Sequence, residues 1–281
     1  MRCPPGRFGA WQVPHIWLAG AAPSDGVLAH YRAWDSVAVA PARTGQAYHR
    51  GVCMIKFYYT LAPNPFKVAL MLEETGLPYE TVPVDTRRGQ QFAPEYLAIN
   101  PNAKTPSIVD GDVTVFDSNA ILLYLAEKTG KFLPPDTPAA RGQMLSWLMF
   151  VATGIGPYSG QAVHFKHYAP EPKTYAVQRY SYEAERHWGI VDAQLAKHRY
   201  MLGDTYTLVD MAVWGWARAA AFVLGQEAWE KLTHVKRHLD EVSARPAAAR
   251  ADAIKGRFQF KSEMDDEARR YMFPQVAAKS A

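Results

Sequence analysis

The sequence holds only two cysteines, Cys3 and Cys53, and both precede residue 54 of the 281. Two cysteines so far apart cannot build a disulfide framework, a zinc cluster or a Cys-x-x-Cys redox pair. Long hydrophobic runs are also missing, since no stretch comes near the ~18 apolar residues that are typical of a membrane span. We therefore expect a cytoplasmic protein that binds no metal and does not enter a membrane.

Lysine and glutamate are absent from residues 1–53, which carry five arginines and two aspartates. The rest of the chain holds 26 basic and 25 acidic residues and is therefore almost neutral. A basic stripe that would neutralise nucleic-acid phosphates is not evident. The charge pattern thus argues against nucleic acid as a partner.

Residues 1–53 show no sustained helical or strand period and are dotted with Pro, Gly and Ala. We interpret them as a poorly ordered N-terminal extension or an over-long gene start. A secretory signal or an Arg-rich transit-like peptide is the alternative. The pattern of a folded core begins at Met54.

Residues 54–133 have the element order of a thioredoxin-like α/β domain. Aromatic and β-branched runs predict the strands, while Asn64 as N-cap and Pro65 as first helical residue predict the start of the first helix. The expected elements are strands at 55–60 and 79–84, a helix between them that ends at Gly76, and a helical turn at 94–97. Strands at 106–109 and 113–116 should follow, joined by the tight turn Asp110-Gly111. A helix capped by Asp117 and Ser118 should then run to Gly130.

Residues 139–257 repeat apolar side chains every three or four positions, which predicts an all-helical second domain. Thr207 and Asp210 have the spacing of a capping box ahead of a buried helix. Arg245-Pro246 is expected to end the last core helix. Residues 258–281 are interpreted as a charged tail whose aromatic anchors are Phe258, Phe260, Tyr271 and Phe273.

Several motifs occur in a fixed order along these two domains. They are Ala62-Pro-Asn-Pro-Phe-Lys-Val-Ala69, Asn100-Pro-Asn-Ala-Lys-Thr-Pro106, Asp117-Ser118-Asn-Ala-Ile-Leu-Leu-Tyr124, Gly160-Gln-Ala-Val-His-Phe-Lys-His167 and, in the tail, Glu263-Met-Asp-Asp-Glu-Ala-Arg-Arg270. Together they resemble the glutathione transferase superfamily, most of all the bacterial Nu class of glutathione-dependent disulfide-bond oxidoreductases and the related fungal prion-forming nitrogen regulator. The resemblance implies the glutathione transferase fold.

The resemblance also implies a glutathione site. Thr105 would pair its backbone with the cysteinyl part of glutathione ahead of a cis Pro106, and Asp117 with Ser118 would bind the γ-glutamyl end. An ordinary trans turn and a plain N-cap are the alternatives. Lys104 and Gln91 are weaker candidates near the glycyl end, and each is nearly as well explained as an exposed side chain without a role.

The thiol of glutathione would lie nearest the first helix, where Asn64 matches the Asn of the Nu pattern. A free thiol has a pKa of ~8.5, so a donor there would raise the fraction of thiolate. Asn64 is our candidate catalytic residue, and the alternative is that its oxygen merely caps the helix. Ala62 departs from the threonine common in the Nu class, which leaves Thr60 or Tyr59 as substitutes, although strand aromatics are more often core residues.

The stretch 154–182 is rich in polar and aromatic residues and is expected to line the pocket of the second substrate. The candidates are Tyr158, Gln161, His164, His167 and Tyr175, together with Tyr168 and Tyr182. Arg179 looks like the Nu-class arginine that holds glutathione carboxylates, with a surface ion pair as the equal alternative. Arg179, Lys166, His164 and His167 would give the pocket a positive lining. His164 and His167 lack a third ligand, so a metal site is not expected.

The chain is thus expected to be an enzyme that uses an activated glutathione thiolate as co-substrate. We expect a disulfide-bond reductase with some conjugating activity toward electrophiles. A non-catalytic glutathione- or ligand-binding regulatory protein of the same fold is the alternative. The family also implies a homodimer.

Deleting residues 1–53 should leave a folded protein that binds glutathione, because the core pattern begins at Met54. Circular dichroism and retention on immobilised glutathione, with the full chain beside the shortened one, check this. A truncation that is insoluble or is not retained would contradict it.

Overall fold

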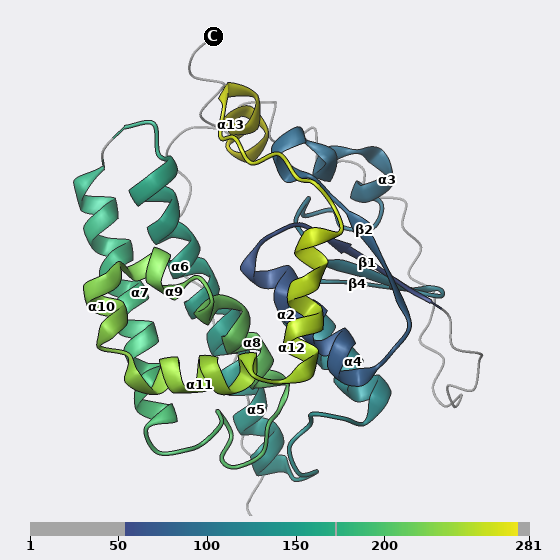
Figure 1. Cartoon of the computed structure of the whole chain (residues 1–281), viewed down its shortest axis with the longest axis vertical. Helices are drawn as coiled ribbons and strands as arrows, with labels where there is room; N and C mark the ends of the chain where they lie inside the picture. Colours follow the sequence, from purple (N-terminus) through teal and green to yellow (C-terminus); the bar gives the residue numbers. More distant parts are fainter. Residues whose placement is uncertain (1–53, 172, 275–281) are drawn as a thin grey trace, which may run out of the picture. The chain divides into compact units, whose positions relative to one another are not determined.

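The computed structural model describes residues 54–171 and 173–274 (Figure 1). The predicted extension 1–53 and the last seven residues of the predicted tail lie outside the described residues. The first domain holds the strands β1 (Ile55–Tyr59), β2 (Tyr79–Pro83), β3 (Ser107–Asp110) and β4 (Val113–Phe116), with the helices α2 (Pro63–Thr75), α3 (Pro94–Leu97) and α4 (Ser118–Thr129) and the 3-10 turns η2 (Thr86–Arg88) and η3 (Gln90–Phe92). The predicted thioredoxin-like order is confirmed.

The four strands form one sheet in the order β2-β1-β3-β4. β1 runs parallel to β2, because α2 carries the chain back across the sheet, while β1–β3 and β3–β4 are antiparallel. Gly111, with φ of 64°, lies in the tight turn that joins β3 to β4, as Asp110-Gly111 predicted.

The register of the sheet brings four chain segments to one edge. Tyr58 of β1 pairs with Ser107 of β3, which pairs with Phe116 of β4, and Tyr59 pairs with Pro83 of β2. The chain therefore leaves β1, β2 and β4 and enters β3 at the same edge. The segments found there are 60–62, 84–87, 103–106 and 117–118, and we call them the loop edge.

Helix α2 begins two residues before the predicted position. Its N-cap is Ala62, whose backbone is extended at φ −148° and ψ 160°, and Pro63 is its first residue. The prediction of Asn64 as N-cap was therefore wrong, because Pro63 suits the first helical position as well as Pro65 does. The predicted end is confirmed, since Gly76 adopts a left-handed conformation with φ of 72° and donates to the carbonyl of Leu72.

Within the described residues the second domain consists of helices and the loops that join them, apart from one isolated β-bridge. Its elements are α5 (Pro138–Phe150), η4 (Val151–Ile155), α6 (Gly156–Val163), η5 (His164–Tyr168), α7 (Thr174–Leu195), α8 (Leu208–Ala217), α9 (Ala220–Leu224), α10 (Gln226–Glu230), α11 (Thr233–Ser243), α12 (Pro246–Ala253) and η6 (Ile254–Gly256), of which η4 and η5 are π-helical. None of the helices in the described part is long and apolar enough to cross a membrane.

The capping box at the start of α8 is present as predicted. The buried carboxylate of Asp210 accepts hydrogen bonds from the backbone N–H groups of Thr207 and Met201, both at 2.8 Å, and lies 3.0 Å from Nε2 of His238 in α11. One carboxylate thus joins the start of α8 to the loop before it and to the next long helix.

Helix α11 ends at Ser243, just before Arg245-Pro246 as expected, but the expectation that it is the last core helix was wrong, because α12 follows. Pro246 is the first residue of α12, and the extended backbone of Arg245 forms its N-cap. The buried side chains of α12 are Ala247, Ala248 and Ala251, and the helix packs against α2. A proline begins a helix as readily as it ends one, and only the alanine pattern after it distinguishes the two cases.

The tail returns to the first domain through its aromatic residues, as predicted. Phe258 and Phe260 pack edge-on against Tyr59 of β1. Helix α13 (Asp266–Met272), yellow in Figure 1, packs against η2, where the ring of Tyr271 covers Gly89. The tail therefore covers one side of the loop edge.

Helices α2 and α8 lie unusually close to each other. A Cβ atom on Gly215 would lie 2.4 Å from Cγ of Lys67 and 2.7 Å from the carbonyl oxygen of Pro63, so a larger residue would force the helices apart. This contact leaves Lys67 only 1% exposed. Burial lowers the pKa of Lys67 to about 7, against a smaller opposing effect of the nearby Asp117.

The free energy of unfolding should rise with pH through the titration of Lys67. Its pKa is about 7 in the folded protein and ~10.4 in an unfolded chain, so the unfolded state binds more protons between these values. We expect wild type to gain about 2 kcal/mol more stability than Lys67→Met between pH 7 and pH 9. Urea unfolding at both pH values measures this, with the exposed Lys56→Met as control. Equal gains in wild type and Lys67→Met would contradict the assignment.

Candidate functional site

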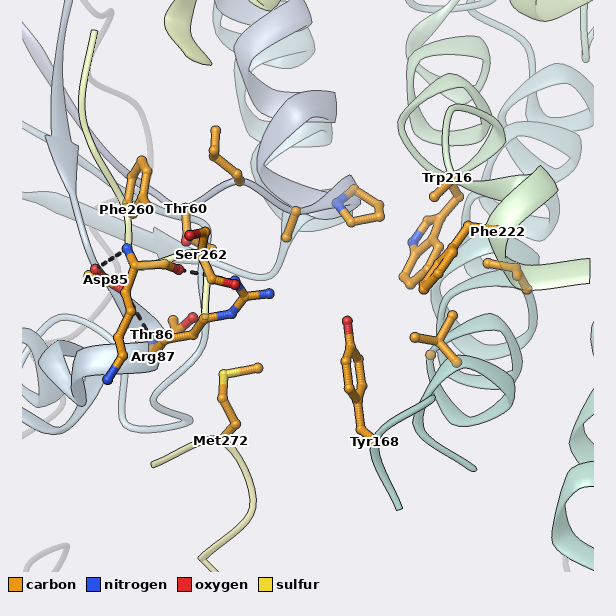
Figure 2. Close-up of a pocket in the computed structure, with 18 residues that line it drawn as sticks. Thr60, Asp85, Thr86, Arg87, Tyr168, Trp216, Phe222, Phe260, Ser262 and Met272 are labelled. Atoms are coloured by element: carbon orange, nitrogen blue, oxygen red, sulfur yellow. Dashed lines mark hydrogen bonds between the residues drawn. The ribbon is translucent and has the colours of Figure 1, made fainter. Parts of the chain in front are cut away.

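A pocket of about 440 Å³ opens at the loop edge, between the first domain, the helical domain and the tail (Figure 2). The residues of its more polar wall come from the first domain and the tail and include Thr60, Asp85, Arg87 and Ser262. The facing wall is aromatic and includes Tyr168, Trp216 and Phe222. Figure 2 shows the hydroxyl of Tyr168 and the guanidinium of Arg87 directed into the space between the walls.

The tail is fixed to the first domain by a small hydrogen-bond network beside this pocket. Nη1 of Arg87 donates to the carbonyl oxygens of Lys261, at 3.0 Å, and of Ser262. The backbone N–H of Lys261 donates in turn to Oδ2 of Asp85 at 2.8 Å, and Oδ1 of Asp85 accepts from the N–H of Arg87 at 3.1 Å. Arg87 therefore holds the tail in place while its guanidinium still faces the pocket.

Asn64 lies on the first turn of α2, next to the pocket residue Pro63. Its Oδ1 accepts a hydrogen bond from Nε1 of Trp216 at 2.9 Å. An indole N–H can only donate, so the amide oxygen must face Trp216 and the amide nitrogen must face away. The oxygen makes no cap hydrogen bond to α2. Within the described residues nothing accepts a hydrogen bond from Nδ2 of Asn64, so this donor is available to a ligand.

Asp117 and Ser118 form a second part of the loop edge. Oδ1 of Asp117 accepts from the N–H groups of Asn119 and Ala120, so the predicted helix cap is confirmed. The backbone of Asp117 has φ of 70°, a conformation that costs on the order of 1–3 kcal/mol and is found mostly at functional sites. Asp117 is the single residue between the end of β4 and the start of α4.

The buried Nζ of Lys67 reaches this corner from α2. It lies 3.3 Å from Oγ of Ser118 and 3.4 Å from Oδ1 of Asn119. Ser118 is itself buried, and its oxygen accepts from Lys67, so its hydroxyl hydrogen is free to bind another acceptor. The corner combines a cation, a hydroxyl and a helix N-terminus, which together suit a carboxylate.

The bond between Thr105 and Pro106 is cis, as expected. The carbonyl oxygen of Lys104 accepts from the hydroxyl of Tyr96 and from Nδ2 of Asn100, both at 2.6 Å. These bonds fix the loop that presents the backbone of Thr105 at the loop edge. The side chain of Lys104 is exposed.

Gln91 is buried under the tail. Its Nε2 donates a long hydrogen bond of 3.4 Å to the carbonyl of Tyr271, and its Oε1 is buried without a partner in the described part of the chain. Gln91 therefore touches α13 in the present arrangement, and its predicted contact with glutathione stays a prediction.

Of the residues predicted in the helical domain, Tyr168 lines the pocket, and the other candidates are not part of its lining. Arg179 pairs with Glu183 at 2.6 Å, which is the ion pair given as its alternative role. His164 packs against Phe273 of the tail, and His167 stacks on the pocket residue Phe222. Of the other candidates, Tyr158 packs against His187, Lys166 donates to the carbonyl of Val223, and Gln161 and Tyr175 are exposed.

Of the two proposed substitutes for a hydroxyl at position 62, the structure favours Thr60. Thr60 lines the pocket. Tyr59 is buried and donates to the carbonyl of Ile254 at 3.1 Å, and burial raises the pKa of Tyr59 to about 12. A phenol so occupied is unsuited to activating a thiol.

Four residues of the site were not predicted from the sequence: Lys67 at the corner of Ser118, and Arg87, Trp216 and Met272, which line the pocket. Lys67 left one signal, a lone charge inside the apolar run from Pro65 to Leu70. Trp216 left none, because it reads as one more apolar residue of a buried helix. In residues 54–171 and 173–274 no group of three or more His, Cys, Asp or Glu side chains could hold a metal ion.

The comparisons with known proteins agree with this architecture. The family model described as Glutathione S-transferase, N-terminal domain, matches residues 54–127, and the corresponding C-terminal domain matches 174–241. The disulfide-bond oxidoreductase YfcG of Escherichia coli is 42% identical over 173 residues, which cover 59% of this chain and 80% of that protein.

Two solved structures are also similar. A glutathione transferase of Burkholderia graminis, with two glutathione molecules bound per subunit, is 32% identical with a TM-score of 0.69 and covers 86% of this chain and 99% of its own. A glutathione transferase of Pseudomonas putida, with one glutathione disulfide bound per subunit, is 31% identical with a TM-score of 0.67 and covers 82% and 98%. Both domain models, in the order and at the places where the two folded units lie, show that this chain belongs to the glutathione S-transferase family.

Proposed function

We propose that the protein binds glutathione at the loop edge and uses its thiolate to reduce disulfides, with slower conjugation of electrophiles. The observation that carries this proposal is the free amide nitrogen of Asn64, a donor held at the start of α2 beside the pocket. From Met54 onward the sequence contains no cysteine, so this part of the chain offers no thiol of its own and would use the thiol of the ligand.

The loop edge offers a place for each part of glutathione. The γ-glutamyl carboxylate fits the corner of Ser118 and Lys67, and Asp117 suits its ammonium group. The backbone of Thr105 can pair with the cysteinyl part. Lys104, Gln91 and Arg179 remain proposals for the glycyl end, and Arg179 would have to exchange its ion pair with Glu183 for the ligand.

A donor to the sulfur is what this chemistry requires. At a pKa of ~8.5 only a few per cent of a free thiol is ionised at pH 7, and a shift of ~2 units makes the thiolate the major form. Such a shift corresponds to ~2.7 kcal/mol, which one amide donor and the N-terminus of α2 can supply together. The hydroxyl of Thr60 can add a second donor in place of the one missing at Ala62.

The pocket has room for the second reactant. The thiolate would attack one sulfur of a disulfide, form a mixed disulfide with it and release the other sulfur as a thiolate that takes up a proton. A second glutathione then resolves the mixed disulfide and leaves glutathione disulfide. Related proteins bound to two glutathiones or to the disulfide support a pocket of this capacity. Here Arg87, rather than the predicted cluster around Arg179, gives the pocket its guanidinium.

We also propose that the protein is a homodimer and works in the cytoplasm. Large apolar side chains are exposed on both domains, among them Phe116 and Leu97 on the first and Met149 and Tyr182 on the second. They would be covered in part by a second copy, in line with the family expectation.

Disulfide reduction should be faster than conjugation of a model aryl halide, because Arg87 on the polar wall of the pocket offers a cation to an acidic disulfide. Asn64→Ala should slow reduction by ~10–100-fold if its amide contributes ~1.4–2.7 kcal/mol in the transition state. Steady-state kinetics with a glutathione mixed disulfide and the aryl halide measures both rates. The exposed Gln143→Ala, which also removes an amide, is the control.

Three outcomes would count against this assignment. Faster conjugation than reduction would make the protein a conjugating transferase, and an unimpaired Asn64→Ala would remove Asn64 from catalysis. Retention on immobilised glutathione without turnover of either substrate would favour the non-catalytic binding protein.

Ser118→Ala should weaken glutathione binding by ~1–3 kcal/mol, or about 5- to 150-fold in Kd, because it removes a hydrogen bond to a charged group. Isothermal titration calorimetry measures the change. Ser146→Ala, which removes an exposed hydroxyl in α5, is the matched control and should bind as wild type does. Unchanged binding by Ser118→Ala would reduce this residue to a structural part of the α4 terminus.

A further inference from the structure

Trp216 of α8 contacts both the pocket and the proposed thiol donor Asn64. Its ring lines the pocket, and its indole N–H donates to Asn64 across 152 residues of sequence. Trp216 is only 9% exposed, and this hydrogen bond is partly buried. Removal of the indole nitrogen would therefore take away the hydrogen-bond donor that faces the amide oxygen of Asn64.

The place of the indole is set by two glycines. Gly215 lets α8 approach α2 so closely that a Cβ atom there would meet Lys67 and the carbonyl of Pro63. A Cβ atom on Gly156 of α6 would lie 3.4 Å from Nε1 of Trp216, so no side chain stands beside the indole N–H at that position. The N–H is thus directed at α2 with Asn64 as its acceptor.

An asparagine amide has a donor end and an acceptor end of nearly the same shape, and rotation by 180° exchanges them. Facing the solvent, both orientations would be populated. Beside Trp216 the rotated form would set two N–H donors against each other, and only the observed form makes a hydrogen bond. The indole therefore selects the orientation whose nitrogen faces away from it.

We infer that Trp216 is a positioning residue for the thiol chemistry. Its N–H holds the amide oxygen of Asn64, so that the amide nitrogen is presented as a donor to the glutathione sulfur. This rests on the proposed function, because it gives Asn64 the role of thiol donor. Without the indole N–H, part of the Asn64 population would turn its oxygen toward the sulfur and repel the thiolate.

The test is Trp216→Phe, which keeps an aromatic pocket wall and removes the N–H. Trp214→Phe is the matched control, since Trp214 is on the same helix, is 2% exposed and donates its indole N–H to Ser243 at 2.9 Å, away from Asn64. The readout is the pKa of bound glutathione, followed by thiolate absorbance near 240 nm across pH. Binding of S-methylglutathione, which has no thiol to ionise, measures the rest of the site.

Trp216→Phe should raise the thiol pKa by about one unit and lower kcat for disulfide reduction about tenfold. The Kd for S-methylglutathione should change less than twofold, and Trp214→Phe should leave the thiol pKa as in wild type. In the Asn64→Ala background, Trp216→Phe should add no further shift, because the group that it orients is gone. A full additional shift there would assign the effect to the pocket wall and overturn the inference.

Asn64→Asp gives a second, independent reading if Trp216→Phe does not fold. An aspartate has the same shape and still accepts from Trp216, but it presents an oxygen where the nitrogen was. It should raise the thiol pKa above that of Asn64→Ala, and a pKa at or below the alanine value would overturn the inference. An unchanged thiol pKa in Asn64→Ala would refute the proposed role of Asn64 itself. If the thiol pKa is raised in Asn64→Ala but unchanged in Trp216→Phe, only the positioning role of Trp216 is refuted.

Discussion

The close approach of α8 to α2 at Gly215 is the constraint on which the site depends. At this contact the two domains pack closely, near the expected place of the glutathione thiol. The contact also buries Lys67 and places Trp216 within hydrogen-bonding distance of Asn64. The pocket lies beside this contact, and residues of the tail and of α6 form the rest of its walls. A side chain at Gly215 would move the two helices and would thereby disturb the thiol donor, the buried cation and the pocket together.

The buried amine of Lys67 is costly for folding but useful for binding, because it lies beside Ser118, where the γ-glutamyl carboxylate is proposed to bind. Burial lowers the pKa of Lys67 to about 7, so near neutral pH the empty site holds the charge only in part. A carboxylate bound at Ser118, 3.3 Å from Nζ, would favour the charged form. Ligand binding and proton uptake are therefore expected to reinforce each other here. The strained backbone of Asp117 and the glycine at 215 are structural costs of the same corner.

Most of the first domain could be predicted because its signals are local. Asp110-Gly111, Asp117 as cap and Gly76 as terminator each act within a few residues, and the sheet register then assembles the loop edge. The start of α2 was missed because Pro63 and Pro65 carry the same local signal. Arg179 was expected in the pocket although Glu183, one turn later on the same helix, was a visible ion-pair partner. Trp216 and Asn64 meet only through the packing of α8 on α2, which no local pattern encodes.

No cysteine follows Cys53 in the sequence. The choice between a disulfide and an electrophile as second substrate is therefore expected to depend on the walls of the pocket. One wall carries the guanidinium of Arg87 and the polar groups of the tail, and the other carries the rings of Trp216, Phe222 and Tyr168. An acidic disulfide can use the first wall and a flat electrophile the second, so the same thiolate can serve both reactions. The hydrogen bonds among Asp85, Arg87 and Lys261 hold the tail against this polar wall. The balance between reduction and conjugation is therefore expected to depend on the tail, while the reactivity common to both depends on Asn64 and the indole that orients it.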